Sequence, residues 1–134
     1  MARYVIDAST LLQLLDNELL VDPSHQLVAP TSIRSETLQL LLRDVRRGIR
    51  TDHAALEVHE RATAVKMRLL GDRVSRGTAW RIVREQDWAT LRDAEYLAIV
   101  RLQADALVTV DPDLAARAKG IVPMAPLEAL FTAS

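Results

Sequence analysis

The feature that most constrains the fold is an apolar run from Ala106 to Val110 that ends directly at Asp111 and Pro112. Continuous apolar runs of this length are typical of parallel strands, because helices cover both faces of a parallel sheet. A second β-prone run, Tyr4 to Ile6, ends at Asp7, and a leucine-rich helical segment follows it. Strands that alternate with helices predict an α/β fold around a parallel sheet.

The rest of the chain fits the same alternation, with Pro, Gly and capping residues marking the boundaries. Further short strands are expected at 26–28 and 121–122, and helices at about 9–15, 32–47, 51–70, 78–85, 90–103, 112–119 and 126–131. These elements predict a three-layer α/β/α sandwich with a central, mostly parallel sheet of about four to five short strands. Because no internal repeat or long linker interrupts the 134 residues, a single domain over 1–134 is expected.

Composition excludes some classes of protein. The chain has no cysteine, so it cannot form disulfides or thiolate metal sites. Its 49% hydrophobic and 26% charged residues are ordinary for a globular domain. The N-terminal residues lack the layout of a signal peptide, and no apolar stretch is long enough to span a bilayer. A cytoplasmic protein with no membrane partner is expected.

Charge is unevenly distributed, although the formal net charge is only −1. Residues 34–84 hold twelve of the 17 basic residues and six of the 18 acidic ones. Such a basic middle could hold a phosphate backbone, but arginine-rich helices equally often only solvate their outer faces. The candidate RNA-binding arginines are Arg43, Arg46, Arg47, Arg50, Arg73, Arg76, Arg81 and Arg84. Trp80 or Trp88 could stack on a base, or could fill the core or an interface.

Three acidic residues at element boundaries each have a structural explanation when taken singly. Asp7 could cap the helix that follows it, and Asp111 before Pro112 has the layout of a helix N-cap. The segment from Thr90 to Asp93 resembles a capping box. Each of these residues therefore has both a capping and a functional interpretation.

Glu36 is harder to explain by structure, and its position suggests a shared site. It lies at helical spacing from Ile33 and Leu40, on a partly apolar face where a carboxylate is costly unless paired or metal-bound. In open parallel sheets, the binding crevice lies beyond the carboxyl ends of the strands, where Asp7 and Asp111 are expected. Glu36 and Asp93 could reach that crevice from flanking helices, so the four acids form one candidate site.

Four neighbouring carboxylates repel one another, and a divalent cation would relieve that repulsion. An all-oxygen site suits Mg²⁺ or Mn²⁺, whereas zinc would favour histidine or cysteine. The three histidines, His25, His53 and His59, do not cluster in the sequence pattern. The sequence therefore predicts a Mg²⁺ or Mn²⁺ cofactor.

These acidic positions, in this order, resemble the PIN domain, and more narrowly the VapC-type toxin nucleases of toxin–antitoxin pairs. The matching segments are V-I-D-A-S at 5–9, S-E-T-L at 35–38, T-L-R-D-A-E-Y-L-A at 90–98 and L-V-T-V-D-P-D-L at 107–114. The segment 71–88 is less typical of that family. The resemblance implies a Mg²⁺- or Mn²⁺-dependent endoribonuclease acting on RNA, usually a homodimer, and held inactive by a cognate antitoxin protein.

The resemblance also implies roles for individual residues. Asp7, Glu36, Asp93 and Asp111 would be the catalytic, metal-binding acids. Candidate supporting residues are Ser9, Thr90, Thr109 and Asp113; Asp113 would be either a fifth acid or only a residue of the first helical turn. A metal-activated water attacking phosphorus in line would leave 5′-phosphate and 3′-hydroxyl ends.

Other functions fit the sequence less well. A haloacid-dehalogenase-type phosphatase would need a second aspartate where this chain has Ser9. A phospho-acceptor receiver domain would need an acidic pair beside the first strand and a late lysine pattern, which Lys119 does not provide. A PIN-like module that binds RNA or a partner without cleavage, and a nuclease of housekeeping RNA processing, remain alternatives.

Overall fold

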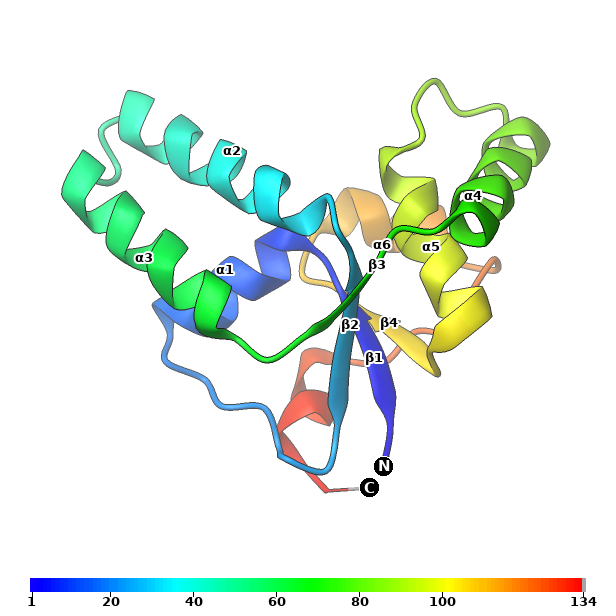
Figure 1. The fold of residues 1–134 in the computed structure, drawn as a ribbon, viewed down its shortest axis with the longest axis horizontal. Coiled ribbons are helices and arrows are strands. Elements are labelled where there is room, and N and C mark those ends of the chain that lie inside the picture. Colours follow the sequence, from blue (N-terminus) through cyan, green and yellow to red (C-terminus); the bar gives the residue numbers. More distant parts are fainter. Residues whose placement is uncertain (134) are drawn as a thin grey trace.

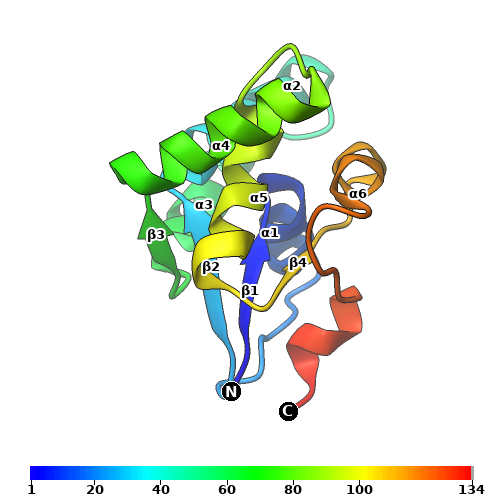
Figure 2. The ribbon, with the colours of Figure 1, turned by 90° about the vertical axis from the view of Figure 1, so that its right-hand side faces the viewer.

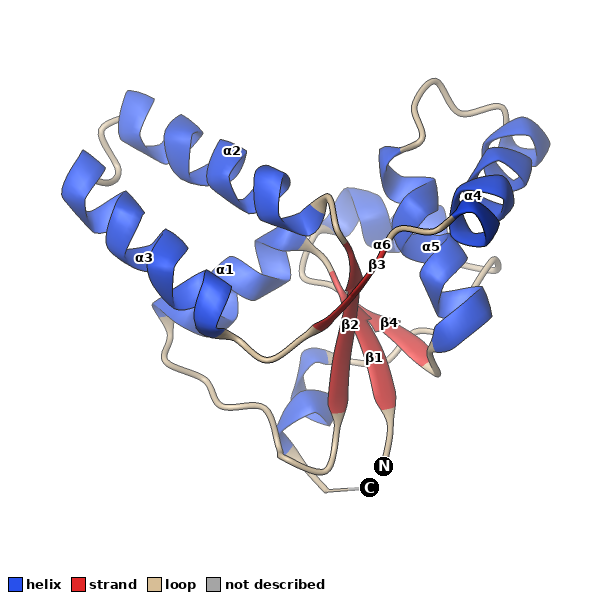
Figure 3. Ribbon diagram, in the orientation of Figure 1, coloured by secondary structure: helices blue, strands red, loops and turns tan. Residues whose placement is uncertain are grey.

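Four short strands form one parallel sheet in the computed structural model, which describes residues 1–133. The strands are β1 (Arg3–Ile6), β2 (Gln26–Pro30), β3 (Arg68–Leu70) and β4 (Ala106–Val108), in the order β3-β2-β1-β4 (Figure 3). Val5 of β1 is paired with Val28 on one side and Leu107 on the other. The two β-prone runs that suggested a sheet are therefore neighbouring strands, with β1 inside the sheet and β4 at its edge.

Helices cover both faces of this sheet (Figures 1 and 2). They are α1 (Ala8–Asp16), α2 (Ile33–Arg46), α3 (Asp52–Ala64), α4 (Arg73–Gln86), α5 (Arg92–Gln103) and α6 (Pro112–Ala118), followed by the 3₁₀ helix η1 (Leu127–Phe131). The expected α/β/α sandwich is confirmed. None of the described helices has the length and apolarity needed to cross a bilayer.

The alternation of side chains along the strands produces two hydrophobic cores. Val5, Val28 and Leu107 point to the face covered by α4, α5 and α6. Ile6 and Val108 point to the opposite face, where α1, α3 and η1 cover them. Helix α2 packs mainly on α1 and α3, and with α3 it extends away from the sheet (Figure 1). Both faces are buried, as expected for a parallel sheet.

Three expected elements differ from the structure. The helix expected over 51–70 ends at Ala64, and residues 68–70 form β3, because pairing with β2 provides tertiary hydrogen bonds that helical spacing cannot reveal. The strand expected at 121–122 is absent from the described chain; a single bridge joins Leu107 to Met124 instead. The basic helix begins at Arg73 rather than 78, because Asp72 caps it by accepting from the Ser75 amide at 2.8 Å.

The strand order places a switch point at β1. From β1 the chain adds β2 and β3 on one side, and it later returns to add β4 on the other. Helices before and after such a reversal diverge, which leaves a crevice beyond the carboxyl ends of the strands. Asp7 follows β1 and Asp111 lies shortly after β4, so both residues lie at this edge.

Candidate active site

Asp7 occupies the N-cap position of α1 but does not cap it, because its side chain accepts no hydrogen bond from the helix backbone. The carboxylate is buried, with 5% of the residue exposed. Two hydroxyls, Thr10 Oγ1 and Thr109 Oγ1, the latter at 3.0 Å, both donate to its Oδ1 atom. Within residues 1–133, Oδ2 accepts no side-chain hydrogen bond. The capping explanation for Asp7 is therefore wrong.

The charge of Asp7 has no basic partner. Burial raises the pKa of its carboxyl above the ordinary value, an effect that the two threonine hydroxyls oppose and that the charge of Asp111 reinforces. In the part of the chain that the structure describes, no Lys, Arg or His forms an ion pair with it. A buried carboxylate without a countercharge is unfavourable.

Asp111 combines a structural role with a place beside Asp7. Its Oδ1 caps α6 by accepting from the Asp113 amide at 2.9 Å. Its own amide donates to Thr109 Oγ1 at 3.0 Å, so Thr109 connects the two aspartates. The capping interpretation of Asp111 is confirmed, and Thr109 has the supporting position that was expected. Asp113 is exposed in the first turn of α6.

Glu36 lies in the first turn of α2 and faces α5. The Tyr96 hydroxyl donates to its Oε2, and Arg92 Nε lies 3.3 Å from its Oε1. Burial nevertheless raises the pKa of the Glu36 carboxyl, and the negative charges of Glu95 and Asp7 add to this effect. Glu36 is therefore oriented by contacts with α5.

Asp93, in the first turn of α5, is paired with Arg117 of α6 at 2.7 Å. The expected capping box is wrong, because Thr90 is exposed and no side chain caps α5. Asp93 and Asp111 share an open pocket of about 420 Å³, which Arg92, Asp113, Ala116 and Arg117 also line.

The four acids do not converge as closely as expected: Asp93 and Asp111 line one open pocket, whereas Glu36 is hydrogen-bonded to Tyr96 of α5. Among residues 1–133 there is no group of three or more His, Cys, Asp or Glu side chains arranged to hold a metal ion. Arginines instead neutralise Glu36 and Asp93. Carboxylate oxygens are the ligand type that a hard divalent cation prefers, and Asp7 Oδ2 accepts no side-chain hydrogen bond within residues 1–133.

Comparison with known proteins supports the fold. No protein-family model and no curated protein matches this sequence. Among solved structures, the chain is similar to PAE2754 from Pyrobaculum aerophilum, with 25% sequence identity and a TM-score of 0.74. The match covers 96% of this chain and 92% of that one. The shared architecture therefore extends over nearly the whole domain.

The candidate RNA-binding arginines fall into two groups on opposite sides of the molecule (Figure 1). Arg43, Arg46 and Arg47 are exposed at the far end of α2, whereas Arg73, Arg76, Arg81 and Arg84 are exposed along α4. Arg50 is held in the fold by ion pairs with Asp16 at 2.5 Å and Asp44 at 2.9 Å, so its assignment to RNA binding is corrected.

The tryptophans and Ser9 differ in accessibility to a ligand. Trp80 is 60% exposed on α4, whereas Trp88 packs against the core and under the Arg117 guanidinium, 5.6 Å from the ring centroid. Ser9 lines a pocket with Arg43 rather than the crevice with the acids. Trp80 is therefore the more accessible tryptophan for stacking.

Several residues that shape the site were missed by sequence reasoning. The carboxylates are contacted by Thr10, Tyr96, Arg92 and Arg117. No sequence motif indicates these contacts. Thr10 follows Asp7 by three residues, a spacing that suits a local side-chain hydrogen bond. The partners of Tyr96 and Arg117 are distant in sequence and depend on how the helices pack.

Proposed function

We propose that this chain is a Mg²⁺- or Mn²⁺-dependent ribonuclease that hydrolyses phosphodiester bonds at the crevice formed by Asp7, Glu36, Asp93 and Asp111. The observation that carries the proposal is the buried carboxylate of Asp7 at the switch point of a parallel sheet, with no basic partner among the described residues. Carboxylates kept charged at a desolvated strand end are characteristic of cation-dependent catalytic sites.

The chain's own residues have distinct tasks in this proposal. A bound divalent cation would supply electrophilic stabilisation of the phosphate and a nucleophilic water. Thr10 and Thr109 fix the Asp7 carboxylate through Oδ1 and leave Oδ2 for the cation. Glu36, whose pKa is raised by burial, accepts a proton more readily than an exposed glutamate and would act as a base.

The family resemblance extends the proposal to partners. A PIN-domain nuclease of the VapC type would act as the toxin of a toxin–antitoxin pair, would form a homodimer and would be inhibited by a cognate antitoxin. Apolar side chains on the outer face of α2, Leu38 at 43% and Leu42 at 39% exposure, offer contact area for such partners.

The proposal is tested by measuring cation binding and cleavage together. Mg²⁺ or Mn²⁺ should raise the melting temperature of the wild-type chain. The added free energy of unfolding should grow with cation concentration and reach about 2.7 kcal/mol at 100 times Kd. Asp7→Asn should lose this response, while Asp52→Asn, an exposed carboxylate of α3, should keep it.

Cleavage of a single-stranded RNA gives the second readout. We expect 5′-phosphate and 3′-hydroxyl ends, and at least ~100-fold slower cleavage by Asp7→Asn. Ends carrying 2′,3′-cyclic phosphate would contradict hydrolysis by water. Full activity of Asp7→Asn would contradict the site.

A binding module without cleavage is a second candidate, and the arginine ion pairs favour it. Arg117 and Arg92 already neutralise Asp93 and Glu36, so less negative charge remains for a cation. In that case RNA would bind equally well with and without Mg²⁺, and no cation-dependent rise in melting temperature would occur. Arg117→Gln would then also fail to create a cation response.

A further inference from the structure

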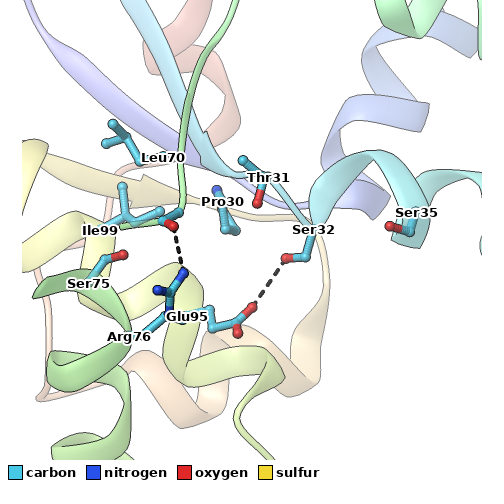
Figure 4. Close-up of a pocket in the computed structure, with 10 residues that line it drawn as sticks. Pro30, Thr31, Ser32, Ser35, Leu70, Ser75, Arg76, Glu95 and Ile99 are labelled. Carbon is cyan, nitrogen blue, oxygen red and sulfur yellow. Dashed lines mark hydrogen bonds between the residues drawn. The ribbon is translucent and has the colours of Figure 1, made fainter. Parts of the chain in front are cut away.

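A second pocket lies beside the acidic crevice and has no role in the proposed chemistry. It has a volume of about 230 Å³ and lies where the start of α2 approaches α4 and α5 (Figure 4). Its residues adjoin the catalytic candidates in sequence, since Ser35 precedes Glu36 and Glu95 follows Asp93 by two positions. Hydrogen bonds from Ser32 to Glu95 and from Tyr96 to Glu36 join the same two helices, α2 and α5, so the pocket lies next to Glu36.

The pocket has an apolar side and a polar side. Pro30, Leu70 and Ile99 supply apolar surface, which suits the flat face of a ring. Glu95 and Arg76 supply opposite charges from α5 and α4.

Glu95 has unused capacity to accept hydrogen bonds. It is half-buried and accepts one hydrogen bond, from Ser32 Oγ to Oε2 at 3.2 Å (Figure 4). It forms no ion pair with any residue in 1–133. A carboxylate has about four acceptor positions, so both oxygens can still receive hydrogen bonds from a ligand.

Arg76 has unused capacity to donate. Its Nη1 donates to the Gly71 carbonyl at 2.7 Å, which fixes the position of the guanidinium among the lining residues (Figure 4). A guanidinium carries five N–H donors, so the remaining ones are available to a ligand. The pocket therefore combines a hydrogen-bond acceptor, Glu95, and a hydrogen-bond donor, Arg76, with an apolar side.

We propose that this pocket binds an unpaired guanine of the RNA substrate, with Glu95 and Arg76 as the residues that determine base specificity. Guanine presents two adjacent donors, N1–H and the N2 amino group, which match the two carboxylate oxygens of Glu95. Its O6 and N7 atoms are acceptors of the kind that arginine recognises. Uracil, cytosine and adenine lack the paired donors. This inference rests on the proposed ribonuclease function, whose substrate preference it specifies.

Binding of the four nucleoside monophosphates to the full chain, without divalent cation, tests the pocket directly. We expect GMP to bind at least about tenfold more tightly than AMP, CMP or UMP in calorimetric or NMR titrations. Glu95→Gln, which loses the charge and one acceptor, should abolish this preference, and Arg76→Gln should weaken it. Glu85→Gln, an exposed glutamate at the end of α4, is the matched control and should bind as the wild type does. Equal affinities for the four nucleotides, no GMP binding, or an unchanged preference in Glu95→Gln would overturn the proposal.

Cleavage mapping separates this inference from the function on which it rests. If RNA is cut next to guanines by the wild type and without that preference by Glu95→Gln, both proposals are supported. If RNA is cut with no guanine preference, the pocket assignment fails and the nuclease stands. If no RNA is cut but GMP still binds selectively through Glu95, the pocket assignment stands and the nuclease fails.

Discussion

Among residues 1–133, Asp7 is the one acidic or basic residue that is buried. Its carboxylate is 5% exposed, and hydroxyl donors rather than a cationic side chain stabilise its charge. Residues held in unfavourable environments of this kind concentrate at functional sites. The stability lost at Asp7 should therefore be recoverable by a substitution that removes the charge.

The first prediction concerns the pH dependence of Asp7. Because burial raises its folded-state pKa above 3.8, the folded chain binds this proton more tightly than the unfolded chain does. The contribution of Asp7 to the free energy of unfolding is therefore greatest below 3.8 and falls as pH rises through the folded pKa. Without divalent cation, Asp7→Asn should be more stable than the wild type at pH 7 and should approach it at low pH. Urea unfolding across this pH range measures the difference, and a variant less stable than the wild type at pH 7 would contradict the prediction.

The second prediction concerns the hydrogen bond from Tyr96 to Glu36. Tyr96→Phe removes a donor that lowers the pKa of the Glu36 carboxyl, so that pKa should rise further. The acid limb of the pH–rate profile should move to higher pH, and the free energy of unfolding should fall by about 1–3 kcal/mol. Tyr4→Phe is the matched control, since the Tyr4 hydroxyl makes no hydrogen bond within the described residues. An acid limb that stayed in place would show that Tyr96 does not position Glu36.

Most of the candidate acids lie at the N-terminal ends of helices. Asp111 caps α6, Glu36 lies in the first turn of α2, and Asp93 lies in the first turn of α5. Carboxylates are favourable at helix N-termini because the helix dipole is positive there. A carboxylate at such a position can therefore stabilise the helix and also take part in catalysis. Substitutions that affect only one of these roles distinguish them.

The third prediction separates them at Asp111. Asparagine caps helices about as well as aspartate, so Asp111→Asn should keep the stability of α6 while slowing cleavage at least ~100-fold. Asp111→Ala should lose both activity and about 1 kcal/mol of stability. Paired measurements of cleavage rate and urea unfolding distinguish the two roles. Normal cleavage by Asp111→Asn would leave Asp111 with only its capping role.

The strand order and the distribution of charge over the whole molecule suggest a path for bound RNA. The switch point at β1 fixes the crevice, and the basic helix α4 borders the pocket next to it. Arg73, Arg76, Trp80 and Arg84 follow helical spacing and form one exposed stripe along α4. The α2 arginines lie on the opposite side of the molecule (Figure 1). We infer that single-stranded RNA follows α4.

The fourth prediction tests this path through salt dependence. For single strands, a plot of the logarithm of affinity against the logarithm of salt concentration has a negative slope of about 0.7 for each phosphate contact. Arg73→Gln combined with Arg84→Gln should reduce that slope by about 1.4, whereas Arg43→Gln combined with Arg47→Gln should not change it. Fluorescence anisotropy with a labelled oligoribonucleotide measures both. Equal effects of the two double variants would contradict the path along α4.

Local sequence signals were sufficient to predict the fold class and the residues at the strand ends. Apolar runs bounded by Asp7 and Asp111 are local signals, and parallel packing requires that such runs be buried. The three-residue strand β3 was not predictable, because its order comes from pairing with β2 rather than from its own composition.

The contacts of each acid depend on tertiary packing. The N-cap position of Asp7 was visible in the sequence, but its carboxylate turns to Thr10 and Thr109 instead of the helix. The ion pair of Asp93 with Arg117 depends on the packing of α5 against α6. Local spacing sets which face of an element a side chain occupies, whereas its hydrogen-bond and charge partners come from distant segments that only folding brings together.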